Sequence, residues 1–416
     1  MTWRLVLGVS GTTLAIAALV VGVAAAPPSV RAENAQARPA SGCNLDISRA
    51  DVAAARATLL AEPEPENLET DVTPGTKTAL GRYKDAIAAL VAARMECAAA
   101  GEDPDAVADA LDRATAPVDC DACRDRAYAA PLVFRGRGSD DARHLLALTA
   151  TLPIPCGSDD MLFVYRHDGA HWREILRWQA PPYDRISGAY GSFEYDIAPP
   201  DAHGDWYVAV KDVPPWCTST WSSVRYAAMR ASSDPMRPKI LYRGNDAMWW
   251  GNDDWGRVTA DADAFEVRFH SSSIDAGAHN RVWVRRFAVS SDAVSRIPPL
   301  AENARDFVDE WLISRWRDVS KWSSDDAVAA LQTWHARLRG GEGNDHASGE
   351  FKSVHACDGR SDAVEVEIAM DTDDVDYFLR VEGTPDTFRL THVGTESDPG
   401  CGGEDLLRGM TDTHAL

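Results

Sequence analysis

Basic residues are scarce in this sequence. Lys and Arg together number 42, against 64 Asp and Glu, so the 416-residue chain carries a net charge of −22 at pH 7. The acidic residues are spread along the chain rather than gathered in one tail. Such a field repels phosphate backbones and anionic lipid headgroups. We therefore expect no nucleic-acid partner.

The sequence also lacks the short motifs that identify many enzyme families. It contains no Gly-x-Ser-x-Gly, no His-Glu-x-x-His, no phosphate-binding Gly-Lys-Ser/Thr and no Gly-x-Gly-x-x-Gly, which excludes the families that carry these signatures. A pair of carboxylates for glycoside hydrolysis has no such signature, because its separation is spatial. We predict no cofactor and no metal centre, and the sequence leaves open whether the protein is an enzyme.

Long apolar runs are absent after residue 26. Before that point, Arg4 is followed by 22 residues, Leu5 to Ala26, without a charge. A basic residue followed by an apolar run indicates an export signal. We predict a signal at residues 1–32 that is cleaved after Ala32; the alternative is a retained inner-membrane anchor at residues 5–26, which are enough to span a bilayer. Both alternatives place the protein outside the cytoplasm, periplasmic or secreted.

Cysteine is absent from the first 42 residues, and eight cysteines follow. In an exported chain they indicate disulfide bonds before metal ligands or nucleophiles. The cysteines fall into three successive segments of the chain, and each segment holds an even number of them, which favours three domains. Eight cysteines permit 105 pairings, and the sequence does not choose among them. The candidates are Cys43, Cys97, Cys120, Cys123, Cys156, Cys217, Cys357 and Cys401.

The period of the apolar residues divides the chain after the signal into four parts. Residues 33–42 form a polar, Ala/Pro-rich leader that we expect to be disordered. Residues 43–126 repeat apolar positions at three-to-four spacing, which predicts a small helical domain. Residues 130–299 alternate with period two, which predicts a central all-β antiparallel domain, either a sandwich or propeller-like. Residues 300–416 predict an α+β domain with two helices on an antiparallel sheet.

Local signals sharpen this plan. Asp103 is a predicted N-cap for the third helix. Asp168 and Gly169, between two strand patterns, predict a tight hairpin turn with both residues at positive φ. The segment from Asn303 to Trp322 predicts one long helix, and the next is expected from Val328 to Leu338. The predicted apolar stripe of the longest N-terminal helix consists of Leu80, Tyr83, Ile87, Leu90, Val91 and Met95.

The stretch "NDAMWWGNDDWGR" from Asn245 to Arg257 is the main candidate for ligand binding. Indole faces stack on sugar rings, and Asn and Asp side chains hydrogen-bond to hydroxyls. The alternative interpretation is a packed corner of the β domain in which the "GND" triplets at Gly244 and Gly251 make turns. The candidate ligand-binding residues are Trp249, Trp250, Asn252, Asp253, Asp254 and Trp255.

Two acidic stretches resemble metal sites but are better explained as loops. "DAHGDW" sets Asp201, His203 and Asp205 at alternate positions, yet it follows two prolines and contains a glycine. "DTDDVDYF", beginning at Asp371, lacks the glycine that a calcium loop requires at its sixth position. We expect a solvated loop in the first case and an acidic hairpin loop in the second.

Two functions are compatible with these observations. The first is a non-catalytic binding or assembly module whose partner is a saccharide or another exported protein. The second is a secreted hydrolase that acts on carbohydrate or cell-wall material, with the tryptophan-rich stretch as substrate platform and a pair of carboxylates as acid and base. A cleft with two carboxylates beside exposed indoles favours the hydrolase.

Overall fold

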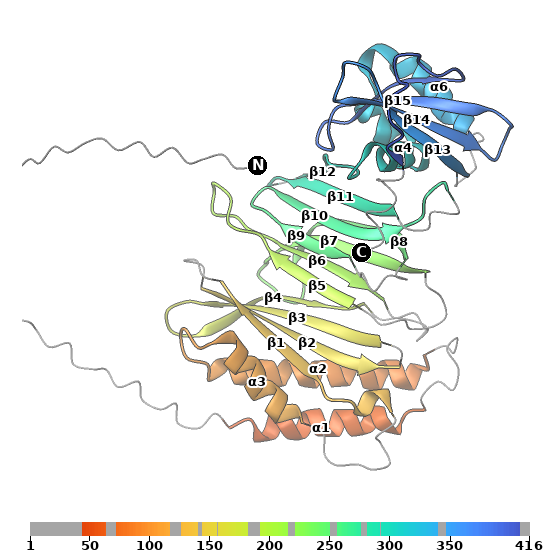
Figure 1. Cartoon of the computed structure of the whole chain (residues 1–416). Coiled ribbons are helices and arrows are strands. Elements are labelled where there is room, and N and C mark those ends of the chain that lie inside the picture. The colour runs from red at the N-terminus through yellow and green to blue at the C-terminus, as the bar shows by residue number, and fades with distance from the viewer. Residues whose placement is uncertain are drawn as a thin grey trace, which may run out of the picture. The chain divides into compact units, whose positions relative to one another are not determined.

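The computed structural model describes residues 44–63, 72–116, 126–139, 144–155, 157–181, 192–214, 221–249, 256–275, 281–291, 293–339 and 347–407. Helices come first, then three antiparallel sheets, then further helices with a fourth antiparallel sheet (Figure 1). The predicted fold class, a β-rich multidomain chain with a helical start and an α+β end, is confirmed. Among the described residues, no helix is both long and apolar enough to cross a membrane.

The N-terminal helices are α1 (Asp46–Ala61), α2 (Pro74–Glu96) and α3 (Pro104–Thr115). As predicted, Asp103 caps α3 by accepting a hydrogen bond from the backbone N–H of Asp105, which satisfies a donor that the first helical turn leaves free. All six residues of the predicted stripe on α2 are buried. They share one hydrophobic core with the first sheet, including Phe163 and Tyr165, so the helices cover one face of that sheet.

Each of the first three sheets has four strands, and each strand pairs with its neighbour in the chain. The first sheet contains β1 (Val133–Gly138), β2 (Leu145–Ile154), β3 (Gly157–His167) and β4 (Trp172–Gln179). The second contains β5 (Ser192–Ile197), β6 (Val208–Val213), β7 (Trp221–Arg230) and β8 (Lys239–Trp249). The third contains β9 (Arg257–Ala260), β10 (Ala264–Ser271), β11 (Arg281–Val289) and β12 (Val294–Arg296).

These sheets pack face to face through their alternating apolar side chains (Figure 1). Leu162 and Leu176 of the first sheet pack against Val210 of the second, and Tyr226 of the second packs near Phe287 of the third. Four-stranded sheets made of consecutive strands and stacked in sequence order are the arrangement of propeller blades. The three sheets are therefore propeller-like in their topology and packing.

The turn between β3 and β4 differs from its prediction. The loop has four residues, from Asp168 to His171, and only Gly169 has a positive φ, at 96°. The Asp168 carboxylate accepts hydrogen bonds from the backbone N–H groups of Ala170 and His171. These side-chain bonds stabilise a longer loop without placing Asp168 in the left-handed region.

The prediction of a turn at Gly244 is wrong, because Gly244 lies inside β8 opposite Tyr226 of β7. A Cβ atom at Gly244 would lie 2.2 Å from the Tyr226 ring. Glycine is therefore needed here so that the ring can lie across the neighbouring strand. The Tyr226 hydroxyl donates to Asp246 at 2.7 Å.

The C-terminal part contains α4 (Ala304–Ile313), α5 (Trp316–Val319) and α6 (Val328–Leu338), packed on a fourth sheet. Its strands are β13 (Gly349–Ala356), β14 (Ala363–Met370), β15 (Asp376–Glu382) and β16 (Arg389–Gly394), paired in chain order. Two predictions are confirmed here. A helix covers Val328 to Leu338, and the acidic stretch after Met370 is a hairpin loop.

The single long helix predicted from Asn303 to Trp322 is interrupted, because α4 ends at Ile313 and Ser314 is extended. Side chains from the end of α6 bind the backbone carbonyl oxygens that would accept hydrogen bonds from the next turn of a continuing helix. Arg339 donates to the carbonyl oxygens of Ile313 and Ser314, and His335 contacts that of Ser314 at 3.0 Å. These contacts satisfy the free C-terminal carbonyls of α4.

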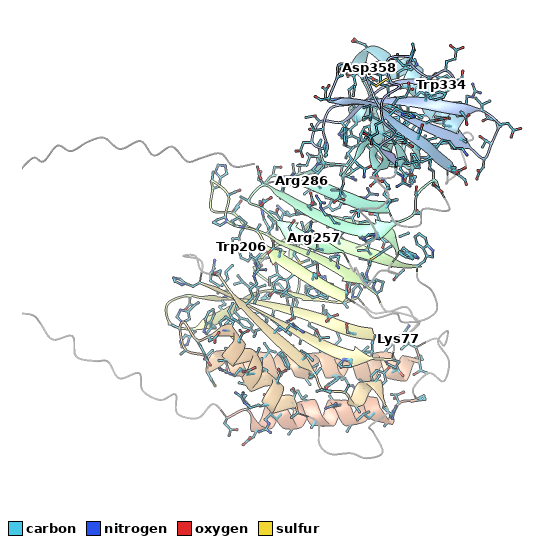
Figure 2. All side chains as sticks on the ribbon, in the orientation of Figure 1. Lys77, Trp206, Arg257, Arg286, Trp334 and Asp358 are labelled. Atoms are coloured by element: carbon cyan, nitrogen blue, oxygen red, sulfur yellow. A yellow bond between two sulfur atoms is a disulfide. The ribbon has the colours of Figure 1, made fainter. Side chains whose placement is uncertain are left out.

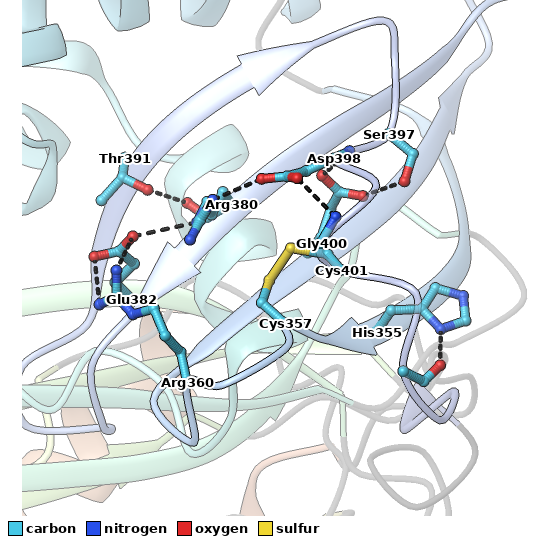
Figure 3. The surroundings of a disulfide bond; sticks show 12 residues. His355, Cys357, Arg360, Arg380, Glu382, Thr391, Ser397, Asp398, Gly400 and Cys401 are labelled. Carbon is cyan, nitrogen blue, oxygen red and sulfur yellow. Dashed lines mark hydrogen bonds and ion pairs between the residues drawn. A yellow bond between two sulfur atoms is a disulfide. The ribbon is translucent and has the colours of Figure 1, made fainter.

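A disulfide joins Cys357, just after β13, to Cys401, which follows β16 (Figure 3). Beside it, Arg360 makes two hydrogen bonds to Glu382, at 3.0 and 2.9 Å. Cys97 is also disulfide-bonded. The remaining five candidate cysteines lie outside the described residues. The disulfide between Cys357 and Cys401 lies within the last of the three predicted segments. The expectation of a disulfide is therefore confirmed for these two cysteines.

A buried network of ion pairs joins the third sheet to α4. Arg281 of β11 is completely buried and contacts Glu310 of α4 at 2.9 Å. Arg285 contacts the same carboxylate at 2.8 Å, and Arg296 lies 3.7 Å from it. Burial alone would raise the pKa of Glu310, but Arg285, Arg281 and Arg296 hold it well below its usual value. We call these three residues the junction arginines.

Candidate functional site

The first and second sheets separate at one end and leave a cleft of about 800 Å³. Its walls come from β4 and from the middle of β6, β7 and β8, with the loop between β7 and β8 at its mouth. Apolar side chains supply much of the lining, and Met236 at the mouth is 48% exposed. A largely apolar concavity of this size with a few polar groups is the usual form of a ligand site.

One row of side chains crosses the second sheet at the base of the cleft. The register aligns Phe193 of β5 with Asp212 of β6, Asp212 with Arg225 of β7, and Arg225 with Asn245 of β8. Their neighbours along β7, among them Tyr226, belong to the core shared with the third sheet. Because side chains alternate between faces of a strand, the row faces the first sheet.

Asp212 and Arg225 form an ion pair in this row, in which Arg225 Nε donates to Asp212 at 2.9 Å. Burial raises the pKa of Asp212, and Arg225 opposes this effect. Behind the cleft, Lys84 of α2 donates to Asp159 at 2.9 Å and to the carbonyl oxygen of Ala180 at 3.0 Å. These paired charges fix the base of the cleft.

On the side of the first sheet, Trp178 of β4 lines the cleft. Its ring stacks on Phe193 of β5, with ring centroids 4.4 Å apart and an interplanar angle of 17°. Trp178 places an apolar ring in the same cleft as Arg225 and Arg243, so one ligand can contact both kinds of group.

The lining is basic, in contrast to the acidic chain. Among the described residues of the lining, four are arginines, and Asp212 alone carries a carboxyl group. Arg177 is paired with Glu174 at 2.6 and 2.7 Å, whereas Arg243 is exposed and has no ion-pair partner among the described residues. We call Arg177, Arg225, Arg237 and Arg243 the cleft arginines.

The structure connects one sequence candidate with this cleft. Trp249 ends β8 and is half-buried. It lies on the same face of β8 as Arg243 and Asn245, because all three are separated by even numbers of residues without a register shift. The cross-strand partner of Trp249 is Trp221 of β7. The other candidates, Trp250, Asn252, Asp253, Asp254 and Trp255, lie outside the described residues.

The weaker metal candidates are loops. The Asp201 carboxylate accepts hydrogen bonds from the backbone N–H groups of His203 and Asp205, at 2.8 and 2.9 Å. It therefore stabilises its own turn. No group of three or more His, Cys, Asp or Glu side chains in the described part of the chain is arranged to hold a metal.

Arg225, Arg243 and Trp178 were not candidates from sequence, although Trp178 lay in a predicted strand. The stretch "WSSVRYAAMR" forms β7, but its serines, alanines and arginines mask the strand pattern. The available signal was the alternation of Val224, Tyr226 and Ala228, all of which are buried. Period-two burial places Arg225 on the opposite face.

Comparisons with protein-family models, with curated proteins and with solved structures found no match to this chain.

Proposed function

We propose that this chain is a non-catalytic binding protein whose cleft captures an anionic ligand with an apolar body. The observation that carries the proposal is Arg243, an exposed guanidinium without an ion-pair partner among the described residues, in a cleft that the Trp178 ring also lines. Guanidinium groups recognise carboxylates, sulfonates and phosphates through paired hydrogen bonds. The Trp178 ring, which lines the cleft and stacks on Phe193, supplies the surface for the apolar part.

The charge balance supports an anionic ligand. In a chain where acids outnumber Lys and Arg by 64 to 42, the described residues of the cleft lining have the opposite balance, with four arginines and one carboxylate. Asp212 is compensated by Arg225, and Arg177 by Glu174. Arg243 therefore supplies the uncompensated positive charge.

The hydrolase receives less support. Hydrolysis by an acid and a base requires two carboxyl groups that reach the substrate. Of the described residues that line the cleft, only Asp212 carries a carboxyl group, and it is 5% exposed and bound to Arg225. Asp159 and Asp160 are buried behind it, at 2% and 4% exposure.

We further propose that the protein works outside the cytoplasm. The basic residue and apolar run at its start support export, and the Cys357–Cys401 disulfide is typical of an oxidising compartment. Fractionation of cells that produce the full chain, with labelling of its free N-terminus after Ala32, tests export and cleavage together. Recovery of an uncleaved chain in the cytoplasm would overturn both.

The ligand proposal is tested with two dyes of similar shape. 8-Anilinonaphthalene-1-sulfonate carries a sulfonate, and N-phenyl-1-naphthylamine is its neutral counterpart. We expect saturable binding of the sulfonate to the folded protein, weakened roughly tenfold by Arg243→Gln because a charge-assisted hydrogen bond is lost. Binding of the neutral dye should not change.

The matched control is Arg257→Gln, an exposed arginine on β9 outside the cleft (Figure 2). It should bind both dyes like the wild type. Equal affinity of the wild type and Arg243→Gln for the sulfonate would overturn the proposal.

A further inference from the structure

We infer that the anionic ligand is a linear acidic oligosaccharide, which lies with one end in the cleft and extends along β8 to the pair formed by Trp221 and Trp249. This inference rests on the proposed function, because it takes the cleft as the site of the anionic group. It adds a second subsite and a chemical class for the ligand.

The two subsites lie on one continuous face. Arg243, Asn245 and Ala247 are exposed at alternate positions of β8, and Trp249 follows on the same face, half-exposed. Six residues of strand separate Arg243 from Trp249, a distance of about 20 Å at roughly 3.3 Å per residue. A monosaccharide is too short for this span, so a ligand that contacts both ends must be an oligomer.

The side chains on the face between the two subsites are small. Ser223 of β7 and Ala247 of β8 are directly opposite each other in the register, and both have small side chains. In the described part of the chain, β7 and β8 continue beyond the end of β6 at Val213, because residues 221–224 of β7 pair with β8 and have no partner on β6. The small residues leave a shallow floor between the charged end and the indole end.

The chemistry of the face matches an acidic sugar chain. Indole rings stack on the apolar faces of sugar rings, and amide and hydroxyl groups bind sugar hydroxyls. Trp221 and Trp249 supply the rings, and Asn245 and Ser223 supply the polar groups. The guanidinium of Arg243 takes a sugar carboxylate.

An extended peptide that adds a strand to the edge of β8 is the competing occupant. The edge is already used at Ala247, whose carbonyl oxygen accepts a hydrogen bond from the Ser271 hydroxyl at 2.7 Å. A peptide strand would have to displace Ser271 of β10, which packs there. The face of β8 remains open, and it is the face that carries Arg243 and Trp249.

The test compares ligand lengths by titration calorimetry. The probes are galacturonic acid, trigalacturonate, hexagalacturonate and neutral maltohexaose, with hexaglutamate as the acidic peptide. We expect the affinity of the wild type to rise at least tenfold from galacturonic acid to hexagalacturonate, with no measurable binding of maltohexaose and weaker binding of hexaglutamate.

Variants separate the two subsites. Trp249→Leu should abolish the gain with length and leave the affinity for galacturonic acid unchanged, and Trp249→Phe should restore most of the gain because it keeps an aromatic ring. Arg243→Gln should weaken the binding of galacturonic acid and that of hexagalacturonate by the same factor. Arg257→Gln is again the matched control and should behave as the wild type.

The outcomes distinguish the inference from the proposed function. If affinity does not depend on length and Trp249→Leu has no effect, the second subsite is overturned, while Arg243-dependent binding of galacturonic acid keeps the cleft as an anion site. If hexaglutamate binds more tightly than hexagalacturonate, the assignment of the ligand as a saccharide is overturned. If neither the saccharides nor the sulfonate dye bind, the proposed function falls as well.

Discussion

The junction arginines and the cleft arginines belong to the same residue type but lie in opposite environments. At the junction, Arg281 and Arg285 have side chains that are 0% and 7% exposed, and both contact Glu310. In the cleft, Arg243 is exposed and Arg237 lies 3.7 Å from an exposed carboxylate. The first group is compensated by carboxylates, chiefly Glu310 on a neighbouring helix, whereas the second includes Arg243, whose exposed charge has no ion-pair partner among the described residues.

This difference separates a structural role from a binding role. A buried charge is tolerated only when a partner and hydrogen bonds replace its water, so the junction arginines are explained by Glu310 and its neighbours. An exposed arginine gains little stability from a surface ion pair. Arg243 is therefore free to bind a ligand without a structural cost.

The largest expected effect comes from the junction. Glu310→Gln keeps the shape of the side chain but removes the carboxylate that Arg281, Arg285 and Arg296 share, so that Arg281 keeps only Asp309 and Arg285 only Asp246 as carboxylate partners among the described residues. We expect the free energy of unfolding to fall by about 3–5 kcal/mol, the usual cost of removing one partner from a buried ion pair. Urea denaturation measures it. A loss below about 1 kcal/mol would show that the junction is not a structural network.

The second effect is a loss of stability in acid at the same junction. His335 is buried at the end of α4, and burial lowers its pKa to about 4. The unfolded chain therefore binds more protons than the folded chain between pH 4 and its ordinary pKa near 6.5. Stability should fall by up to about 3 kcal/mol as the pH decreases through this window.

Denaturation of the wild type and of His335→Gln between pH 7.5 and pH 4 tests this effect. The glutamine amide can still donate to the carbonyl oxygens of Trp311 and Ser314, and it does not titrate. The difference in stability between the two proteins should therefore shift in favour of the variant as the pH falls. A constant difference would contradict the assignment to His335.

A third effect, of opposite sign, comes from Asp160 in the first sheet. Glu310 has guanidinium partners, but among the described residues the Asp160 carboxyl group accepts hydrogen bonds from the hydroxyls of Thr151 and Ser158 alone. Burial raises its pKa to about 6 despite these bonds. Its contribution to stability is thus complete below pH 4 and is lost as the pH rises through about 6.

Replacing Asp160 with Asn removes this loss. We expect Asp160→Asn to stabilise the protein by about 2 kcal/mol at pH 8 relative to its effect at pH 4. Thermal denaturation at the two pH values measures the change. A variant that is less stable at pH 8 than at pH 4, relative to the wild type, would show that the carboxylate is compensated by a charge.

Much of the fold followed from periodicity, because burial on one face of a helix or strand leaves a strong pattern. The stripe on α2 and the change to period two are both observed. The end of α4 was not predictable, since it depends on Arg339 and His335, which reach the carbonyls from another helix. Gly244 was interpreted as a turn because its partner Tyr226 is distant in sequence.

The candidate site was predictable only at one end. The tryptophan-rich stretch drew attention to Trp249, and the structure places this residue on the face that leads to the cleft. The alternation along β7 indicates the face of Arg225 but does not show that this face lines a cleft, because an arginine between small residues looks the same on a surface strand and in a cleft. The role of Arg225 and Arg243 depends on the face of the second sheet to which they belong, and this requires the register of β7 and β8.

The smallest expected effect on stability is that of Arg243→Gln, and it tests the comparison most directly. Because Arg243 is exposed and lacks an ion-pair partner among the described residues, its charge contributes little to the folded state. We expect a change within about 0.5 kcal/mol, together with the roughly tenfold loss of ligand affinity given above. Arg285→Gln should show the reverse, with a large loss of stability because it leaves Glu310 short of a partner. If Arg243→Gln instead destabilised the protein as strongly as Arg285→Gln, both groups of arginines would be structural, and the argument for an anion site in the cleft would fail.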